Sequence, residues 1–200
     1  MRAKVIGLLG SPLPEGNTAI LLDRALQGAA DAGCETEKIV VPFLDFEPCM
    51  EIFFCRDHET CQMEDEMTPL YPKIRDLDGL IVASPVMTMG IPGKLKSLMD
   101  RCQVFFMAKY MRREPLVPKE KRKARNGLYI GISGMNLPTV FDGAKATMAA
   151  FFDIIDCRYW GDLLIRDMDT IRDIRTRPDL LEEAYRKGKE LGTSIQAGRH

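Results

Sequence analysis

Five short and nearly continuous apolar runs alternate along the chain with stretches in which apolar residues recur at every third or fourth position. The runs predict strands buried on both faces, at Val5–Leu9, Lys38–Val41, Gly79–Ala83, Leu128–Ile132 and Tyr159–Ile165. The helical spacing predicts helices over Thr18–Ala32, Tyr71–Leu77, Pro92–Phe106, Val140–Ile155 and Pro178–Ile195. Strands that alternate with helices predict an α/β domain with a doubly wound parallel sheet in three layers.

This architecture also predicts where a ligand binds. Right-handed crossovers between parallel strands place ligands beyond the carboxyl ends of the strands, at the point where the winding reverses. The loops that follow the first, third and fourth strands are therefore the candidate binding loops.

Composition excludes several classes of protein. The 200 residues, 46% hydrophobic and 28% charged, predict one globular domain spanning 1–200. A net charge of −1 gives no general attraction to nucleic acid or to an anionic membrane. No apolar run approaches the ~20 residues of a membrane span, and the first run is shorter than the ~7–15 residues of a signal-peptide core. We expect a cytoplasmic protein that binds neither nucleic acid nor membrane.

The loop after the first strand, Gly10–Thr18, carries the side chains that hold phosphates. Ser11, Asn17 and Thr18 offer hydroxyl and amide groups beside the amino end of a predicted helix, and Gly16 permits close backbone approach. Alternatively, Asn17 or Thr18 caps that helix and no ligand binds.

The loops after the third and fourth strands differ in chemistry. In Ser84–Gly93, Val86, Met87 and Met89 offer an apolar surface suited to a flat ring, and exposed backbone amides could donate to ring carbonyls. The alternative is that these methionines pack inward, as most do. The loop Gly131–Asn136 is small and polar.

These loops resemble those of the flavodoxin-like NADPH-dependent FMN reductase family over residues 1–135. The resemblance rests on Ser11-Pro12 with Gly16-Asn17-Thr18, and on Ser84-Pro85-Val86-Met87 with Lys96 and Asp100-Arg101. It implies a five-stranded sheet in the order 2-1-3-4-5, with FMN as cofactor and NAD(P)H as electron donor. It further implies that the phosphate binds Ser11, Leu13, Gly16, Asn17 and Thr18, and the ring binds Pro85, Val86, Met87, Thr88, Met89 and Gly90, with Ser133, Gly134 and Met135 at its other edge.

Six cysteines in a reducing compartment indicate metal or redox chemistry where they cluster. Cys34, Cys102 and Cys157 are dispersed and are expected as small buried hydrophobes. The remaining three lie in the irregular segment 47–67, the cysteine segment, and are Cys49, Cys55 and Cys61.

The stretch from Pro48-Cys49 to Asp65-Glu66-Met67 resembles the iron–sulfur flavoprotein branch of the family, whose C-x2-C-x2-C-x5-C pattern holds a [4Fe–4S] cluster. Here Cys49, Cys55 and Cys61 occupy three of the four positions, and Ile52 occupies the second. Isoleucine cannot bind iron, so the metal ligand set is incomplete. A ligand from elsewhere such as His58, a zinc site and a structural loop all remain open. In the structural loop, Ile52 would pack with Phe53 or Phe54, and this is the expected outcome.

The segment 107–125, the basic segment, is rich in lysine and arginine. It could contact a nucleotide phosphate or nucleic acid, but it lacks the interleaved aromatic residues of a single-strand binder, so a solvated loop is expected.

The leading hypothesis is an FMN-dependent oxidoreductase that passes electrons from NAD(P)H to a small-molecule or protein acceptor. Its chemistry occurs on the flavin, so no side chain need act as catalytic acid or base. The alternatives are an electron-transfer protein with FMN and a cluster but no nicotinamide substrate, and a flavin-free scaffold. A half-open flavin site also predicts a homodimer or homotetramer whose interface closes it.

Overall fold

The computed structural model describes residues 2–199 and contains one sheet of five parallel strands in the order β2-β1-β3-β4-β5. The strand order and the parallel pairing confirm the predicted doubly wound architecture. The strands are β1 (Lys4–Leu9), β2 (Glu35–Val40), β3 (Gly79–Pro85), β4 (Asn126–Ile132) and β5 (Arg158–Ile165).

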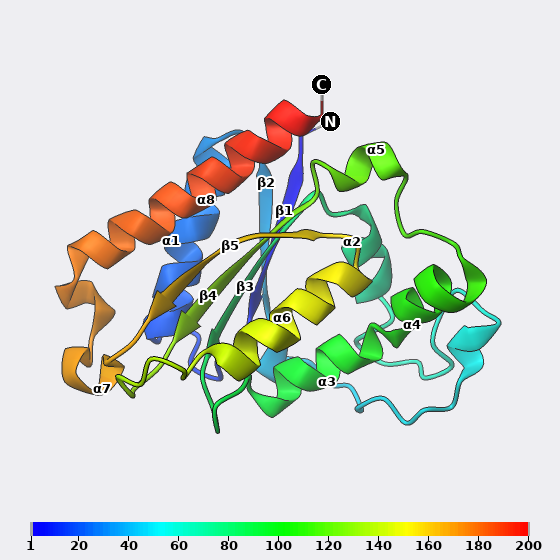
Figure 1. Cartoon of the computed structure of the whole chain (residues 1–200), viewed down its shortest axis with the longest axis horizontal. Coiled ribbons are helices and arrows are strands. Elements are labelled where there is room, and N and C mark those ends of the chain that lie inside the picture. Colours follow the sequence, from blue (N-terminus) through cyan, green and yellow to red (C-terminus); the bar gives the residue numbers. More distant parts are fainter. Residues whose placement is uncertain (1, 200) are drawn as a thin grey trace.

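Helices cover both faces of the sheet, as Figure 1 shows. One face carries α1 (Asn17–Asp31) and α8 (Pro178–Gly198), and the other carries α2 (Leu70–Asp76), α3 (Gly93–Arg101) and α6 (Asp142–Ile154). Each face has its own hydrophobic core. The shorter helices are η1 (Val41–Phe43), η2 (Phe54–Arg56), α4 (Gln103–Phe106), η3 (Met107–Arg112), α5 (Lys119–Arg122), α7 (Met168–Ile171) and η4 (Ile174–Thr176).

Helices α1 and α8 approach each other closely because glycines face each other at their crossing. A Cβ on Gly28 would lie 2.1 Å from the carbonyl oxygen of Tyr185, and one on Gly188 would lie 1.9 Å from that of Ala25. Any larger residue at these two positions would force the helices apart.

Most predicted elements differ from the observed ones by one to three residues at an end, and two of the differences have a clear physical cause. Strand β2 begins at Glu35, before the apolar run. It lies at the edge of the sheet, where its polar residues can face solvent. The predicted helix Pro92–Phe106 divides at Cys102, whose N–H bonds to the carbonyls of both Leu98 and Met99. Cys34, Cys102 and Cys157 are buried, as expected.

The basic segment is not the solvated loop that its composition predicts. Its first part forms the π-helix η3, and its second part includes α5. The carboxylate of Asp156, 1% exposed, lies 3.2 Å from Lys109 Nζ and 3.0 Å from Arg122 Nη2. Arg125 is 3% exposed and donates to backbone carbonyl oxygens around the carboxyl end of α2, including that of Arg75 at 3.1 Å. These cations are held by a distant carboxylate and by backbone carbonyls, which local charge patterns do not reveal.

Within residues 2–199, no helix combines the length and the apolar character needed to cross a bilayer.

Candidate functional site

The three candidate loops lie side by side at the carboxyl edge of the sheet, at the lower edge of Figure 1. Each loop begins with one further bond to the neighbouring strand. Gly10 N donates to Ala83 O at 2.8 Å, Val86 N donates to Ile132 O at 2.8 Å, and Ser133 N to Ile165 O at 2.8 Å. The sheet ladder therefore fixes the starting points of all three loops.

The first loop leaves the amino end of α1 open. Ser11 Oγ accepts from Leu13 N at 3.2 Å, and Gly16 N donates to Leu13 O at 3.1 Å, so the loop folds on itself. Gly16 precedes the helix and contributes no side-chain cap. Helix geometry leaves the first N–H groups of α1 without intrahelical partners, and these groups can bind an anion.

The alternative that Asn17 or Thr18 caps α1 is wrong, since α1 has no side-chain cap and Thr18 is buried. Asn17 instead bonds to the far end of the chain. Its Nδ2 donates to Arg172 O at 2.8 Å, and its Oδ1 accepts from Ile174 N at 3.0 Å. This contact holds the backbone of residues 172–174 against the first loop.

The second loop is a tight hairpin. Met87 and Gly90 exchange two backbone bonds, of 2.9 and 3.0 Å. The two residues between them, Thr88 and Met89, have φ of 49° and 61°. Left-handed backbone is unfavourable for a β-branched residue such as threonine, and such strain concentrates at functional sites.

Apolar side chains are exposed at this edge, so the alternative of inward-packed methionines is wrong. Met87 is 46% exposed, Met89 38% and Met135 48%. Leu13 of the first loop and Leu137, which follows the third loop, are also exposed. Exposed apolar surface of this kind marks a ligand or an interface. The predicted ring loop thus offers an apolar face to a planar group.

The third loop packs on a segment that sequence reasoning missed. Ser133 Oγ accepts from Met135 N at 3.2 Å, and a Cβ on Gly134 would lie 2.4 Å from Asp169 Oδ1. Met168 N donates to Ser133 O at 2.9 Å. The segment 167–175 therefore links the third loop to Asn17 in the first. Its helices are too short to leave a periodic signal.

The binding loops carry almost no ionisable side chains. Glu15 is the single acidic residue in Gly10–Thr18, and Ser84–Gly93 and Gly131–Asn136 contain no Asp, Glu, His, Lys, Arg, Cys or Tyr. The three loops themselves therefore offer mainly backbone groups, hydroxyls and apolar side chains to a ligand.

The cysteine segment surrounds a cavity of about 300 Å³ whose lining includes Cys49 and Cys55. Ile52 lies outside the lining and is 52% exposed, so it is not the apolar anchor expected of a structural loop. No three His, Cys, Asp or Glu side chains converge on a metal-binding arrangement within residues 2–199. Burial raises the pKa of Cys55, and Cys61 and Cys49 nearby raise it further.

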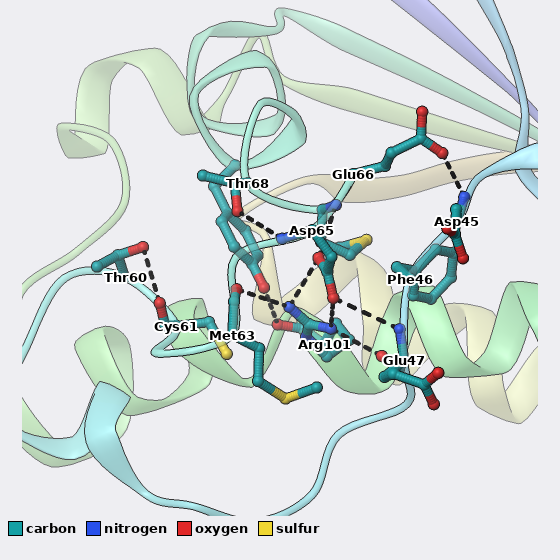
Figure 2. A network of polar contacts seen from close by, with 12 residues as sticks. Asp45, Phe46, Glu47, Thr60, Cys61, Met63, Asp65, Glu66, Thr68 and Arg101 are labelled. Atoms are coloured by element: carbon teal, nitrogen blue, oxygen red, sulfur yellow. Dashed lines mark hydrogen bonds and ion pairs between the residues drawn. The ribbon is translucent and has the colours of Figure 1, made fainter.

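Two arginines hold the cysteine segment in place. Arg101 of α3, 1% exposed, binds Asp65 with both terminal nitrogens, at 2.6 and 3.1 Å, and also binds the carbonyl of Glu47 at 2.7 Å (Figure 2). Arg112 of η3 donates to Cys55 O at 2.6 Å and to His58 O at 3.1 Å. The segment is therefore anchored at both ends.

Comparison with known proteins agrees with this geometry. Residues 3–135, more than half of the chain, match the model of a family described as NADPH-dependent FMN reductase. The chain belongs to this family. The matched region contains the whole cysteine segment and the first two binding loops, and it ends at Met135 in the third.

The curated relatives belong to the branch that the cysteine segment resembles. An iron-sulfur flavoprotein of Methanocaldococcus jannaschii is 41% identical over 98 residues, which cover 49% of this chain and 51% of that protein. An iron-sulfur flavoprotein of Methanosarcina thermophila is 37% identical over 98 residues, covering 49% and 51%. The chain spans about half the length of these relatives in the matched region.

Solved structures share the fold of this family member. A flavone reductase superimposes with a TM-score of 0.70 at 15% identity, covering 98% of this chain and 64% of that chain. An NAD(P)H:quinone oxidoreductase from Methanothermobacter marburgensis gives 0.69 at 16% identity, covering 96% of both chains. These likenesses confirm the flavodoxin-like fold.

Proposed function

We propose that this family member is an FMN-dependent oxidoreductase that takes electrons from NAD(P)H and passes them to a small-molecule or protein acceptor. The observation that carries the proposal is the carboxyl edge of the sheet. There, an open helix amino end and an exposed apolar hairpin lie together, in loops whose one carboxylate is Glu15. The family match supports FMN as the bound group.

The residues at this edge fit FMN. The first N–H groups of α1, among them that of the buried Thr18, would hold the phosphate together with Ser11, and Leu13 and Gly16 shape the loop around it. The hairpin Pro85–Gly90 would place Val86, Met87 and Met89 against the ring, with the backbone amides of Thr88 and Met89 facing its carbonyls, since those of Val86, Met87 and Gly90 are already bonded. Ser133, Gly134 and Met135 would border its other edge. When bound, FMN supplies hydride and electron transfer, so these residues bind, orient and exclude water.

The cysteine segment does not fit a [4Fe–4S] cluster in the same way. Ile52 offers no thiolate and lies outside the cavity that Cys49 and Cys55 line. We therefore assign no electron-transfer step to a cluster. The names of the curated relatives, and the cavity that Cys49 and Cys55 line, keep electron transfer without a nicotinamide substrate as the second candidate function.

The exposed methionines also favour an assembly. A ring resting on Met87 and Met89 would be open to solvent in one copy, so we propose a homodimer or homotetramer in which a neighbouring copy closes the site.

Anaerobic stopped-flow reduction tests the proposal. Purified protein should bind one FMN per chain, and NADH or NADPH should bleach the flavin absorption. Protein that binds FMN but is bleached by neither nucleotide, while dithionite reduces it, would support the second candidate. Protein that binds no FMN after reconstitution would contradict both.

A further inference from the structure

The backbone turn Arg172–Arg175 is hydrogen-bonded to the first binding loop, although about 155 residues separate the two in the sequence. Both polar atoms of the Asn17 amide are used in this contact, one on Arg172 O and one on Ile174 N. A further bond joins Arg175 Nη2 to Glu15 O at 3.4 Å. The backbone of Arg172 and the guanidinium of Arg175 are thereby held beside the loop that we propose binds the phosphate.

The turn has an unusual conformation. Arg172 has φ 61° and ψ −53°, and Asp173 N donates to Ile171 O at 2.7 Å, which makes a three-residue γ-turn. This form of γ-turn is rare and strained for a residue with a Cβ. The bonds to Asn17 on both sides of the strained peptide hold it in place. Because the Asn17 side chain of the binding loop maintains the strained backbone at Arg172, we expect the turn to have a role at that loop.

Charge gives the reason for such a role. The phosphate of FMN carries up to two negative charges, yet the loop Gly10–Thr18 contains no lysine or arginine and does contain Glu15. The turn brings the guanidinium of Arg175 to this loop, where it also lies 3.4 Å from the carboxylate of Asp173. Arg172, which begins the turn, is exposed and bonds to the loop through its backbone carbonyl. Guanidinium groups bind phosphate well because their N–H donors match its oxygens.

We propose that Arg172 and Arg175 supply the positive charge that selects the phosphate of FMN, and that Asn17 is a positioning residue for their turn. The inference rests on the proposed function, because it concerns the same cofactor. The proposed phosphate site then includes residues that lie outside the region 3–135 matched by the family.

Flavin titrations of the apoprotein test the proposal, with FMN and riboflavin as the two probes. Riboflavin lacks the phosphate, so it reports on the ring site alone. Arg172→Ala and Arg175→Ala should each weaken FMN binding on the order of tenfold and leave riboflavin binding within about twofold. Arg186→Ala is the matched control, since Arg186 is exposed and, like Arg175 with Asp173, paired with a nearby carboxylate, but lies on α8. It should change neither affinity.

A second variant separates charge from backbone strain. Arg172→Gly removes the charge and relieves the left-handed conformation, so it should weaken FMN binding while the melting temperature stays equal or rises. Arg172→Lys should recover part of the FMN affinity. Equal FMN affinity in wild type and in both alanine variants would overturn the inference, as would parallel losses of FMN and riboflavin.

The role of Asn17 is tested by a mutant cycle. Asn17→Ala should weaken FMN binding in the wild type but add little in the Arg172→Ala/Arg175→Ala background, because its effect passes through the turn. Fully additive losses would show that Asn17 touches the phosphate itself and would contradict its positioning role. Wild-type apoprotein that binds neither flavin refutes the proposed function, whereas FMN binding that ignores these arginines refutes the inference alone.

Discussion

Replacing Arg101 with methionine tests whether one buried ion pair anchors the cysteine segment. The guanidinium is 1% exposed and the Asp65 carboxylate 16% exposed. The substitution keeps the aliphatic volume but removes the bonds to Asp65 and to the carbonyls of Glu47 and Met63. Asp65 is then left with the backbone donors Met67 N and Glu47 N, the latter drawn in Figure 2.

The expected cost follows from that burial. Removing one partner of a buried pair destabilises a protein by about 3–5 kcal/mol, chiefly because the other charge stays desolvated. Asp65 keeps the bond from Met67 N at 2.9 Å and some solvent contact, so we expect the lower end, about 3 kcal/mol. For a chain of this size, each kcal/mol lowers the Tm by about 2–4 °C, which gives a fall of about 6–12 °C.

Two assays separate global from local effects. Thermal unfolding followed by circular dichroism measures the Tm, and labelling with a thiol reagent under native conditions measures how often the cysteine segment opens. Lys96→Met is the control, because the Lys96–Asp100 pair on the same helix is about half exposed and should contribute under about 1 kcal/mol. An Arg101→Met protein with the labelling rate and Tm of Lys96→Met would refute the anchoring role.

The effect should also depend on pH. Burial by itself raises the pKa of Asp65, but the bonds from Arg101 and Met67 outweigh it and hold that pKa below its usual value of about 3.9. A carboxyl whose pKa is lowered by folding contributes its full stability above the unfolded value and loses it as the pH falls through the folded value. The stability gap between wild type and Arg101→Met should therefore be constant near neutral pH and close below about pH 4. A gap that persists unchanged in acid would contradict the ion-pair origin.

Three other changes have defined outcomes. Ile52→Cys should gain no iron or acid-labile sulfide on anaerobic reconstitution, because this position lies outside the cavity lined by Cys49; a gain of both would show that the segment can still build a cluster. Ser11→Asp should release FMN, measured as flavin per chain after gel filtration, since it places a negative charge beside the phosphate loop, and Ser11→Ala is its neutral control. Gly188→Ala should lower the free energy of unfolding by about 1–3 kcal/mol in a denaturant titration, because its Cβ meets the backbone of α1; an unchanged value would mean that α8 shifts freely. Static light scattering at micromolar concentration should give a dimer or tetramer, and an FMN-bound monomer would contradict the closed flavin site.

Hydrophobic patterning along the chain was sufficient to predict the sheet and the candidate binding edge. Buried parallel strands such as Leu128–Ile132 are continuous apolar runs, and this signal is local. The order of strands and helices then requires the loops after β1, β3 and β4 to meet at one edge. The short motifs around Ser11 and Pro85 were sufficient to indicate the family, because their residues lie close together in the chain.

The support of those loops, in contrast, comes from contacts that form only when distant parts of the chain meet in the fold. Asn17 has the residue type of a helix cap or a phosphate ligand, yet its amide binds a turn 155 residues away at Arg172. The basic segment has the composition of a solvated loop, yet Arg125 is buried among backbone carbonyls. Long-range polar contacts of this kind depend on the meeting of two distant backbones. They follow no period along the chain, so hydrophobic patterns and local charge cannot reveal them.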